Sequence, residues 1–170
     1  MDCIKMVVTM NPCKCGFFPD RNRCRCTISE VRRYQDRIGQ PLLDRFDLCA
    51  RTKPVAFDEL KGEQRGEPSA AIRERVLQAR ERQESRYRSH PFTFNGEIPT
   101  GMLDTCCRLG FKEERLMDRL FTGGKLSARG YHRVLKTART IADLEGKERI
   151  SLDHLSEAVC YRLTEGREEA

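Results

Sequence analysis

The sequence predicts a mainly helical protein that begins with a short α/β part. The short β-branched run at residues 4–10 predicts a strand, and residues 47–55 are expected to form a second one. Beyond a polar segment at residues 61–68, apolar residues recur at intervals of three and four, which is the helical period. We therefore expect one part over residues 1–60, with two short strands and a cysteine-rich loop, and an all-helical part over residues 61–170.

Local signals set the elements of the first part. The strand at residues 4–10 should end at Pro12, because proline cannot donate to a sheet ladder. Thr27 followed by Glu30 forms a capping-box pattern, which predicts a helix over residues 28–38. A turn or short helix at 42–46 should then lead into the second strand.

Three serines are expected to cap helices in the second part: Ser69, Ser127 and Ser151. The first helix should run to about Arg88 and the second should stop at Gly146. Two shorter helices are expected between them, at 100–109 and 112–121. The residues that should face the core are Ile72, Val76 and Ala79 in the first helix, Tyr131, Val134, Leu135, Ala138, Ile141 and Ala142 in the second, and Leu152, Leu155, Ala158, Val159 and Leu163 in the last.

Composition excludes some classes of protein and favours others. No stretch of 18 apolar residues occurs, so we expect no membrane span. No secretion signal is present, so we expect a cytoplasmic protein with reduced thiols. The formal net charge is +6 and arginine outnumbers lysine 24 to 8, which favours a phosphate-bearing partner. Residues 21–37 hold six arginines against two acids, a balance that suits contact with a nucleic-acid backbone.

Four cysteines lie within fourteen residues as two C-x-C pairs, Cys13 with Cys15 and Cys24 with Cys26. Two short pairs joined by a loop can supply the four soft ligands of a tetrahedral zinc site. A reduced loop without metal, a disulfide and an iron–sulfur cluster are alternatives that the spacing leaves open. The other cysteines are expected to be core or inert: Cys3, Cys49, Cys106, Cys107 and Cys160.

Two arginines are notable for their positions. Arg45 lies in the run LLDRFDL, where an ion pair with Asp44 or Asp47 is the ordinary explanation. Arg129 is expected in the first turn of a helix, where the helix dipole disfavours a cation unless its side chain reaches an anion. The 170 residues contain no phosphate loop G-x-x-x-x-G-K-[ST], and the VAFDE run at 55–59 lacks the context of a magnesium site.

Four motifs follow one another over residues 4–163: VVTMNPCKCG, C-x-C, PLLDRFDL and LSARGYHRVLKTARTIADLEG. In this order they resemble the C-terminal part of the Mg-chelatase-like AAA+ ATPases of the ComM/YifB type. The resemblance implies that Asn11 is the sensor-1 residue that positions the attacking water. It implies that Arg45 is the arginine finger for a neighbouring subunit's site and that Arg129 is the sensor-2 residue of a helical lid. Lys14 stands where the family commonly has proline. The N-P-C-x-C-G run distinguishes the chain from the chelatase subunit itself, so chelation is not expected.

The resemblance implies an intact protein that forms a ring of identical subunits, uses ATP with Mg²⁺, and acts on DNA as a branch-migration motor in competence. Residues 1–60 are then expected to be the C-terminal remnant of the α/β core, and residues 61–170 the helical lid. The N-terminal part of the same core is the expected partner. On its own the chain is expected to bind nucleotide weakly and to hydrolyse none. The main alternative is a standalone zinc-stabilised helical protein that binds nucleic acid, and a third interpretation is a degenerate AAA+-derived interaction module.

Overall fold

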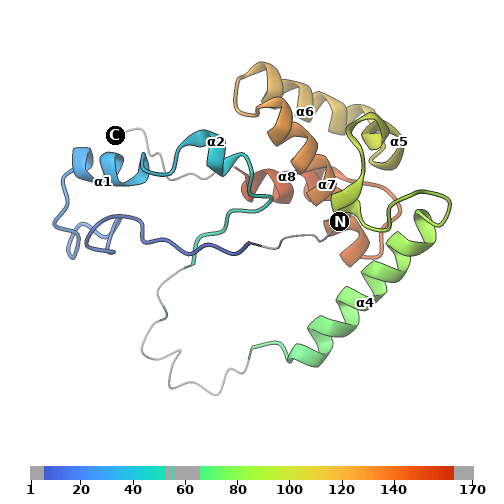
Figure 1. Ribbon diagram of the computed structural model, residues 1–170, viewed down its shortest axis with the longest axis horizontal. Coiled ribbons are helices and arrows are strands. Elements are labelled where there is room, and N and C mark those ends of the chain that lie inside the picture. The colour runs from blue at the N-terminus through green and yellow to red at the C-terminus, as the bar shows by residue number, and fades with distance from the viewer. Residues whose placement is uncertain (1–5, 53–54, 56–65, 163–170) are drawn as a thin grey trace. The chain divides into compact units, whose positions relative to one another are not determined.

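The structure, a computed structural model, describes residues 6–52, 55 and 66–162 (Figure 1). These residues form two compact units, 6–46 and 47–162. Every regular element in the described ranges is a helix, which confirms the expectation of a mainly helical protein. None of these helices combines the length and the apolar character that a membrane crossing requires.

The first unit contains α1 (Ile28–Gln35) and the short α2 (Gln40–Leu43). The predicted capping box starts α1. Glu30 N donates to Thr27 Oγ1 at 3.3 Å, and Thr27 N donates to Glu30 Oε2 at 2.9 Å. The bonds from Thr27 hold the pKa of the Glu30 carboxyl below its usual value. The helix is therefore confirmed, although it ends at Gln35 rather than at residue 38.

The structure does not show the two predicted strands. The described residues of the first run, 6–10, and of the second, 47–52 and 55, lie in no strand, and the other residues of both runs lie outside the described ranges. The apolar side chains of Val7 and Val8 are exposed. A strand exists only through hydrogen bonds to a neighbouring strand, and an apolar run in the sequence does not supply that neighbour.

The second unit is organised around α7, which contacts α4, α5, α6 and α8. The helices are α4 (Ser69–Arg86), α5 (Leu103–Cys106), α6 (Phe111–Thr122), α7 (Ala128–Leu144) and α8 (Leu152–Cys160), with the 3₁₀ turns η1 (Asn95–Glu97) and η2 (Thr100–Met102) before α5. Ser127 and Ser151 cap α7 and α8 as predicted. Gly146 follows the end of α7 with a φ of 72°, a left-handed conformation that favours glycine.

The apolar stripes of α7 and α8 form the core of this unit. Of the residues predicted to face inward, Tyr131 and Leu152 are half-buried and Leu163 lies outside the described residues. The others are buried: Val134, Leu135, Ala138, Ile141, Ala142, Leu155, Ala158 and Val159. The helical period of the sequence therefore located this core correctly.

The N-terminal half of α4 departs from the prediction. Ser69 is the first helical residue rather than the cap, and Pro68 occupies the cap position without a side-chain hydrogen bond. Ala79 is buried, but Ile72 and Val76 are 42% and 43% exposed. The reason is that polar contacts attach α4 to α7 near its C-terminal end.

These contacts centre on Asp143 of α7, whose side chain is fully buried. Its carboxylate accepts hydrogen bonds from both terminal nitrogens of Arg86, from Arg139 Nη2 at 3.1 Å and from Asn95 Nδ2 at 2.9 Å. The bond to Asp143 raises the pKa of Arg86, whereas near-complete burial lowers that of Arg139. Tyr87 of the α4 end donates to Asn95 Oδ1 at 2.7 Å, so the network joins α4, η1 and α7.

We expect Asp143→Asn to destabilise the second unit by about 3–5 kcal/mol, because it leaves the buried Arg139 cation without its counter-charge. Asp118→Asn, at an exposed position of α6, is the matched control and should change stability by less than about 0.5 kcal/mol. Urea unfolding followed by far-ultraviolet circular dichroism measures both. A loss below about 1 kcal/mol for Asp143→Asn would show that the network contributes little.

Candidate functional site

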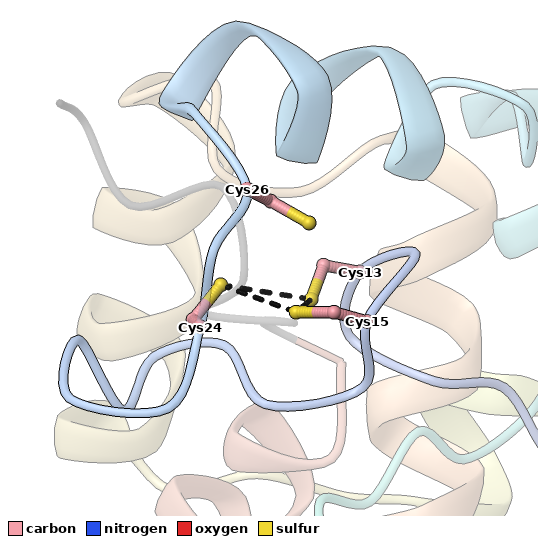
Figure 2. Close-up of side chains that lie close together, drawn as sticks. All are labelled: Cys13, Cys15, Cys24 and Cys26. Carbon is pink, nitrogen blue, oxygen red and sulfur yellow. Dashed lines mark hydrogen bonds between the residues drawn. The ribbon is translucent and has the colours of Figure 1, made fainter.

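The two C-x-C pairs come together in the first unit, with all four sulfur atoms within 4.8 Å of one another. Cys13 Sγ lies 3.3 Å from Cys15 Sγ and 3.8 Å from Cys24 Sγ, and the sulfur atoms of Cys15 and Cys24 are 3.6 Å apart. Figure 2 shows the side chain of Cys26, in the segment that leads into α1, directed toward the other three. The structure therefore brings together the four cysteines that the sequence predicts as ligands.

Two tight turns position the cysteine pairs. Gly16 N donates to the carbonyl oxygen of Cys13 at 3.1 Å, and Gly16 has a φ of 82°, where a side chain would be strained. In the second turn the carbonyl oxygen of Asp20 accepts a hydrogen bond from Cys24 N at 2.7 Å. The loop therefore turns back at both ends, which brings the second pair against the first.

The thiols of the cluster differ in acidity. Backbone N–H groups of Phe17 and Arg25 donate to the sulfur of Cys15 and lower its pKa to about 6. Burial raises the pKa of Cys24 to about 11. Burial also opposes ionisation of Cys13, but backbone hydrogen bonds outweigh it and the pKa is lowered. Without a metal the cluster therefore holds thiolate and thiol groups side by side, and metal binding must release the remaining protons.

The donor set fits a zinc ion. Tetrahedral coordination with zinc–sulfur bonds of about 2.3 Å places sulfur atoms about 3.8 Å apart. The sulfurs of Cys13, Cys15 and Cys24 lie 3.3–3.8 Å apart, and all four lie within 4.8 Å of one another. Four cysteine ligands fill the coordination shell and leave no position for water or substrate, as in structural zinc sites. The arrangement can therefore hold a metal that stabilises the loop, and metal binding itself stays a prediction.

The other cysteines have varied surroundings. Cys107 is buried, and burial raises the pKa of its thiol to about 12. Cys49 and Cys106 are half-buried, Cys160 is exposed, and Cys3 lies outside the described residues. Among the described cysteines of this group, only Cys107 is fully buried in the core.

The residues that the resemblance assigns to nucleotide chemistry are all exposed. Asn11 precedes the cysteine loop, and its side chain borders Gly16, where an added Cβ would lie 3.9 Å from Asn11 Cγ. Arg45 follows α2 and donates from Nη1 to the carbonyl oxygen of Pro41 at 2.6 Å. Asn11 and Arg45 lie in the first unit and Arg129 lies in the second, in the first turn of α7. Of the VAFDE run, only its first residue is within the described ranges.

Two features of the structure were not predicted. Gln35 of α1 donates from Nε2 to the carbonyl oxygen of Pro12 at 3.0 Å and so ties the helix to the chain just before the first cysteine. Nothing in the sequence marks that contact. The buried Asp143 did have a signal, because Arg139 stands four residues earlier on the same apolar face, the spacing of a helical ion pair.

Comparisons with known proteins identify the family. The family described as "Magnesium chelatase, subunit ChlI" matches residues 3–60, and "Magnesium chelatase, subunit ChlI C-terminal" matches residues 66–162. The chain is 35% identical over 159 residues to the competence protein ComM of Haemophilus influenzae and to YifB of Salmonella typhimurium. It is 32% identical over 166 residues to the protein Rv2897c of Mycobacterium tuberculosis.

The alignments with ComM and YifB cover 93% of this chain and 30% of each relative, and the alignment with the mycobacterial protein covers 96% and 32%. The chain therefore belongs to the Mg-chelatase-like family that includes ComM and YifB. It spans about a third of the length of these relatives.

Proposed function

We propose that the chain is the C-terminal part of an AAA+ ATPase, with residues 1–60 completing the α/β core and residues 61–170 forming the helical lid. The observation that carries the proposal is the unbroken order of the two family matches, the ChlI family at residues 3–60 followed by its C-terminal family at residues 66–162. The compact second unit around α7 is consistent with a lid. In the intact core, the runs at 4–10 and 47–55 pair with neighbouring strands.

The proposed roles follow from the chemistry of each side chain. ATP with Mg²⁺ supplies the phosphoryl group whose transfer the motor uses. Asn11 orients the attacking water, Arg45 stabilises the developing charge at a neighbouring subunit's site, and Arg129 brings the lid onto the phosphates. A guanidinium has five N–H donors, and the bond from Arg45 to the Pro41 carbonyl occupies one of them. Exposure of Asn11, Arg45 and Arg129 in this chain suits residues that act on groups outside it.

The intact protein is proposed to be a ring-forming cytoplasmic motor that acts on DNA. Two observations support this: the Haemophilus relative is a competence protein, and arginine is in excess in this chain. The four cysteines are proposed to bind structural zinc. Magnesium chelation is not proposed, because the N-P-C-x-C-G run is not a feature of the chelatase subunit that the family is named after.

The test is ATP hydrolysis by a chimera in which this chain replaces the matching 30% of the Haemophilus relative. We expect the chimera to form a ring, seen by size-exclusion chromatography, and to hydrolyse ATP. The purified 170-residue chain should show only background turnover, since it contains no phosphate loop. Turnover by the chain alone, or a ring-forming chimera without hydrolysis, would contradict the proposal.

The second candidate function is a standalone zinc-stabilised protein that binds nucleic acid. The observation in its favour is that the cysteine cluster is complete within residues 13–26 and needs no ligand from elsewhere. It predicts nucleic-acid binding by the chain alone that does not change when ATP is present. The genomic sequence directly upstream separates the two candidates, because only the ATPase requires an in-frame phosphate loop there.

A further inference from the structure

We propose that the loop between the cysteine pairs, residues 16–23, contacts the DNA backbone through Arg21 and Arg23, and that the metal-holding cluster keeps this loop in its binding conformation. This inference rests on the proposed action on DNA and assigns a surface to it. It predicts that DNA contact depends on the cluster as well as on the two arginines.

The first support is how the loop holds its two arginines. The guanidinium carbon of Arg23 lies 4.2 Å from the centre of the Phe17 ring, and that of Arg21 lies 5.1 Å from the centre of the Phe18 ring. Both arginines are exposed. A guanidinium held over an aromatic ring loses less freedom on binding and keeps its in-plane N–H groups for a phosphate.

The second support is the charge of the loop. Its one acid, Asp20, closes the turn, since Oδ1 accepts a hydrogen bond from Asn22 N at 3.0 Å. The carbonyl oxygen of Asp20 also accepts hydrogen bonds from Arg23 N and Cys24 N. The carboxylate of Asp20 therefore has a local role in the turn. The remaining charges of the loop are cationic, which favours an anionic partner.

The third support is the link between the loop and the cluster. Cys15 precedes the loop and Cys24 follows it, and their sulfur atoms are 3.6 Å apart. Figure 2 shows the loop closed at its base by these side chains. Of the described apolar residues of the first unit, only Cys13 and Val31 are buried, so the loop is held by the cluster and by its own turns rather than by an apolar core.

An alternative explanation is that the arginines offset the charge of the metal-loaded cluster, because four thiolates around a divalent ion carry a formal charge of about −2. Lys14 and Arg25 alternate with the cysteines in the sequence and are placed for that task. Arg21 and Arg23 lie over rings instead. If they served only the cluster, replacing them would lower the zinc content and leave the salt dependence of DNA binding unchanged.

The experiment compares Arg21→Ser/Arg23→Ser with a matched control, Arg80→Ser/Arg115→Ser, in the full 170-residue chain. The control also removes two exposed arginines that lie over phenyl rings, Arg80 over Phe94 at 4.7 Å and Arg115 over Phe111 at 5.8 Å. Fluorescence anisotropy with a labelled 30-base-pair duplex and the matching single strand, over a series of salt concentrations, gives the slope of log K against log salt. Zinc content is measured on every sample.

In the loop variant we expect the magnitude of the slope of log K against log salt to fall by about 1.8 on duplex and by about 1.4 on single strand. These are the contributions of two phosphate contacts, and the zinc content should be unchanged. The control should keep the wild-type slope, and wild-type chain stripped of zinc should match the loop variant. Equal slopes for the loop variant and the control, or loss of zinc from the loop variant, would overturn the inference and leave the proposed motor standing. Absence of DNA binding by the wild-type chain would also overturn the inference, whereas the proposed motor is tested separately by ATP hydrolysis of the chimera.

Discussion

Replacing Cys15 and Cys24 together with serine is expected to abolish zinc binding and to unfold the first unit while the second unit stays folded. Structural zinc contributes about 10–16 kcal/mol of apparent binding free energy in small metal-dependent folds, and that energy is folding energy where no other core exists. Among the described apolar residues of the first unit, only Cys13 and Val31 are buried. The second unit has its own buried apolar core around α7.

Atomic emission gives the zinc content, and hydrogen exchange with mass spectrometry reports on each unit separately. We expect about one zinc per wild-type chain and rapid exchange of α1 in the double variant, with α7 still protected. Cys106→Ser/Cys160→Ser is the control, because both cysteines lie in the second unit. Less than about 0.2 zinc per freshly purified wild-type chain, or protection of α1 that is equal in both variants, would contradict the prediction.

The sequence was sufficient where local interactions decide the structure. Ser127 caps the start of α7 and Gly146 follows its end, and the capping box of Thr27 and Glu30 starts α1. These signals could be read from the sequence because each depends on residues within one turn. The approach of the two C-x-C pairs could also be predicted, because only a short loop separates them.

The sequence was insufficient where the partner of a residue lies far along the chain. The run at residues 4–10 has the composition of a strand, but composition does not show which other strand it would pair with. Ile72 and Val76 follow the helical period of α4, and yet they are exposed because α4 is attached near its other end. The loop arginines show a different limit: their rings, Phe18 and Phe17, are close in the sequence, but the spacing of residues 16–23 does not predict which arginine lies over which ring.

The proposed role of Arg45 in catalysis requires a neighbouring subunit. Within this chain the side chain is exposed and donates to the Pro41 carbonyl, while Asp47, one of the two acids considered as its partner, forms an ion pair with Arg133. An exposed arginine at the end of a short helix has no catalytic meaning by itself. It gains one only if a second subunit places a nucleotide against it.

Arg45→Ala in the ATPase chimera is therefore expected to lower kcat by about 10³-fold or more with little change in KM, because an arginine finger stabilises charge that develops in the transition state. Arg33→Ala, at an exposed position of α1, is the matched control and should keep kcat within about twofold. Steady-state ATP hydrolysis measures both, and ring formation is checked on the same samples.

A mixing experiment then tests whether Arg45 acts on a neighbouring subunit. Chimera subunits with Arg45→Ala are mixed with subunits whose phosphate-loop lysine, upstream of this chain, is replaced, so that each form is inactive alone. In a mixed ring, an intact Arg45 from one subunit faces an intact nucleotide site of the other, and part of the activity should return. If Arg45 acted within its own subunit, every site of the mixed ring would still carry one of the two defects, so a mixture as inactive as its components would contradict action on a neighbouring subunit.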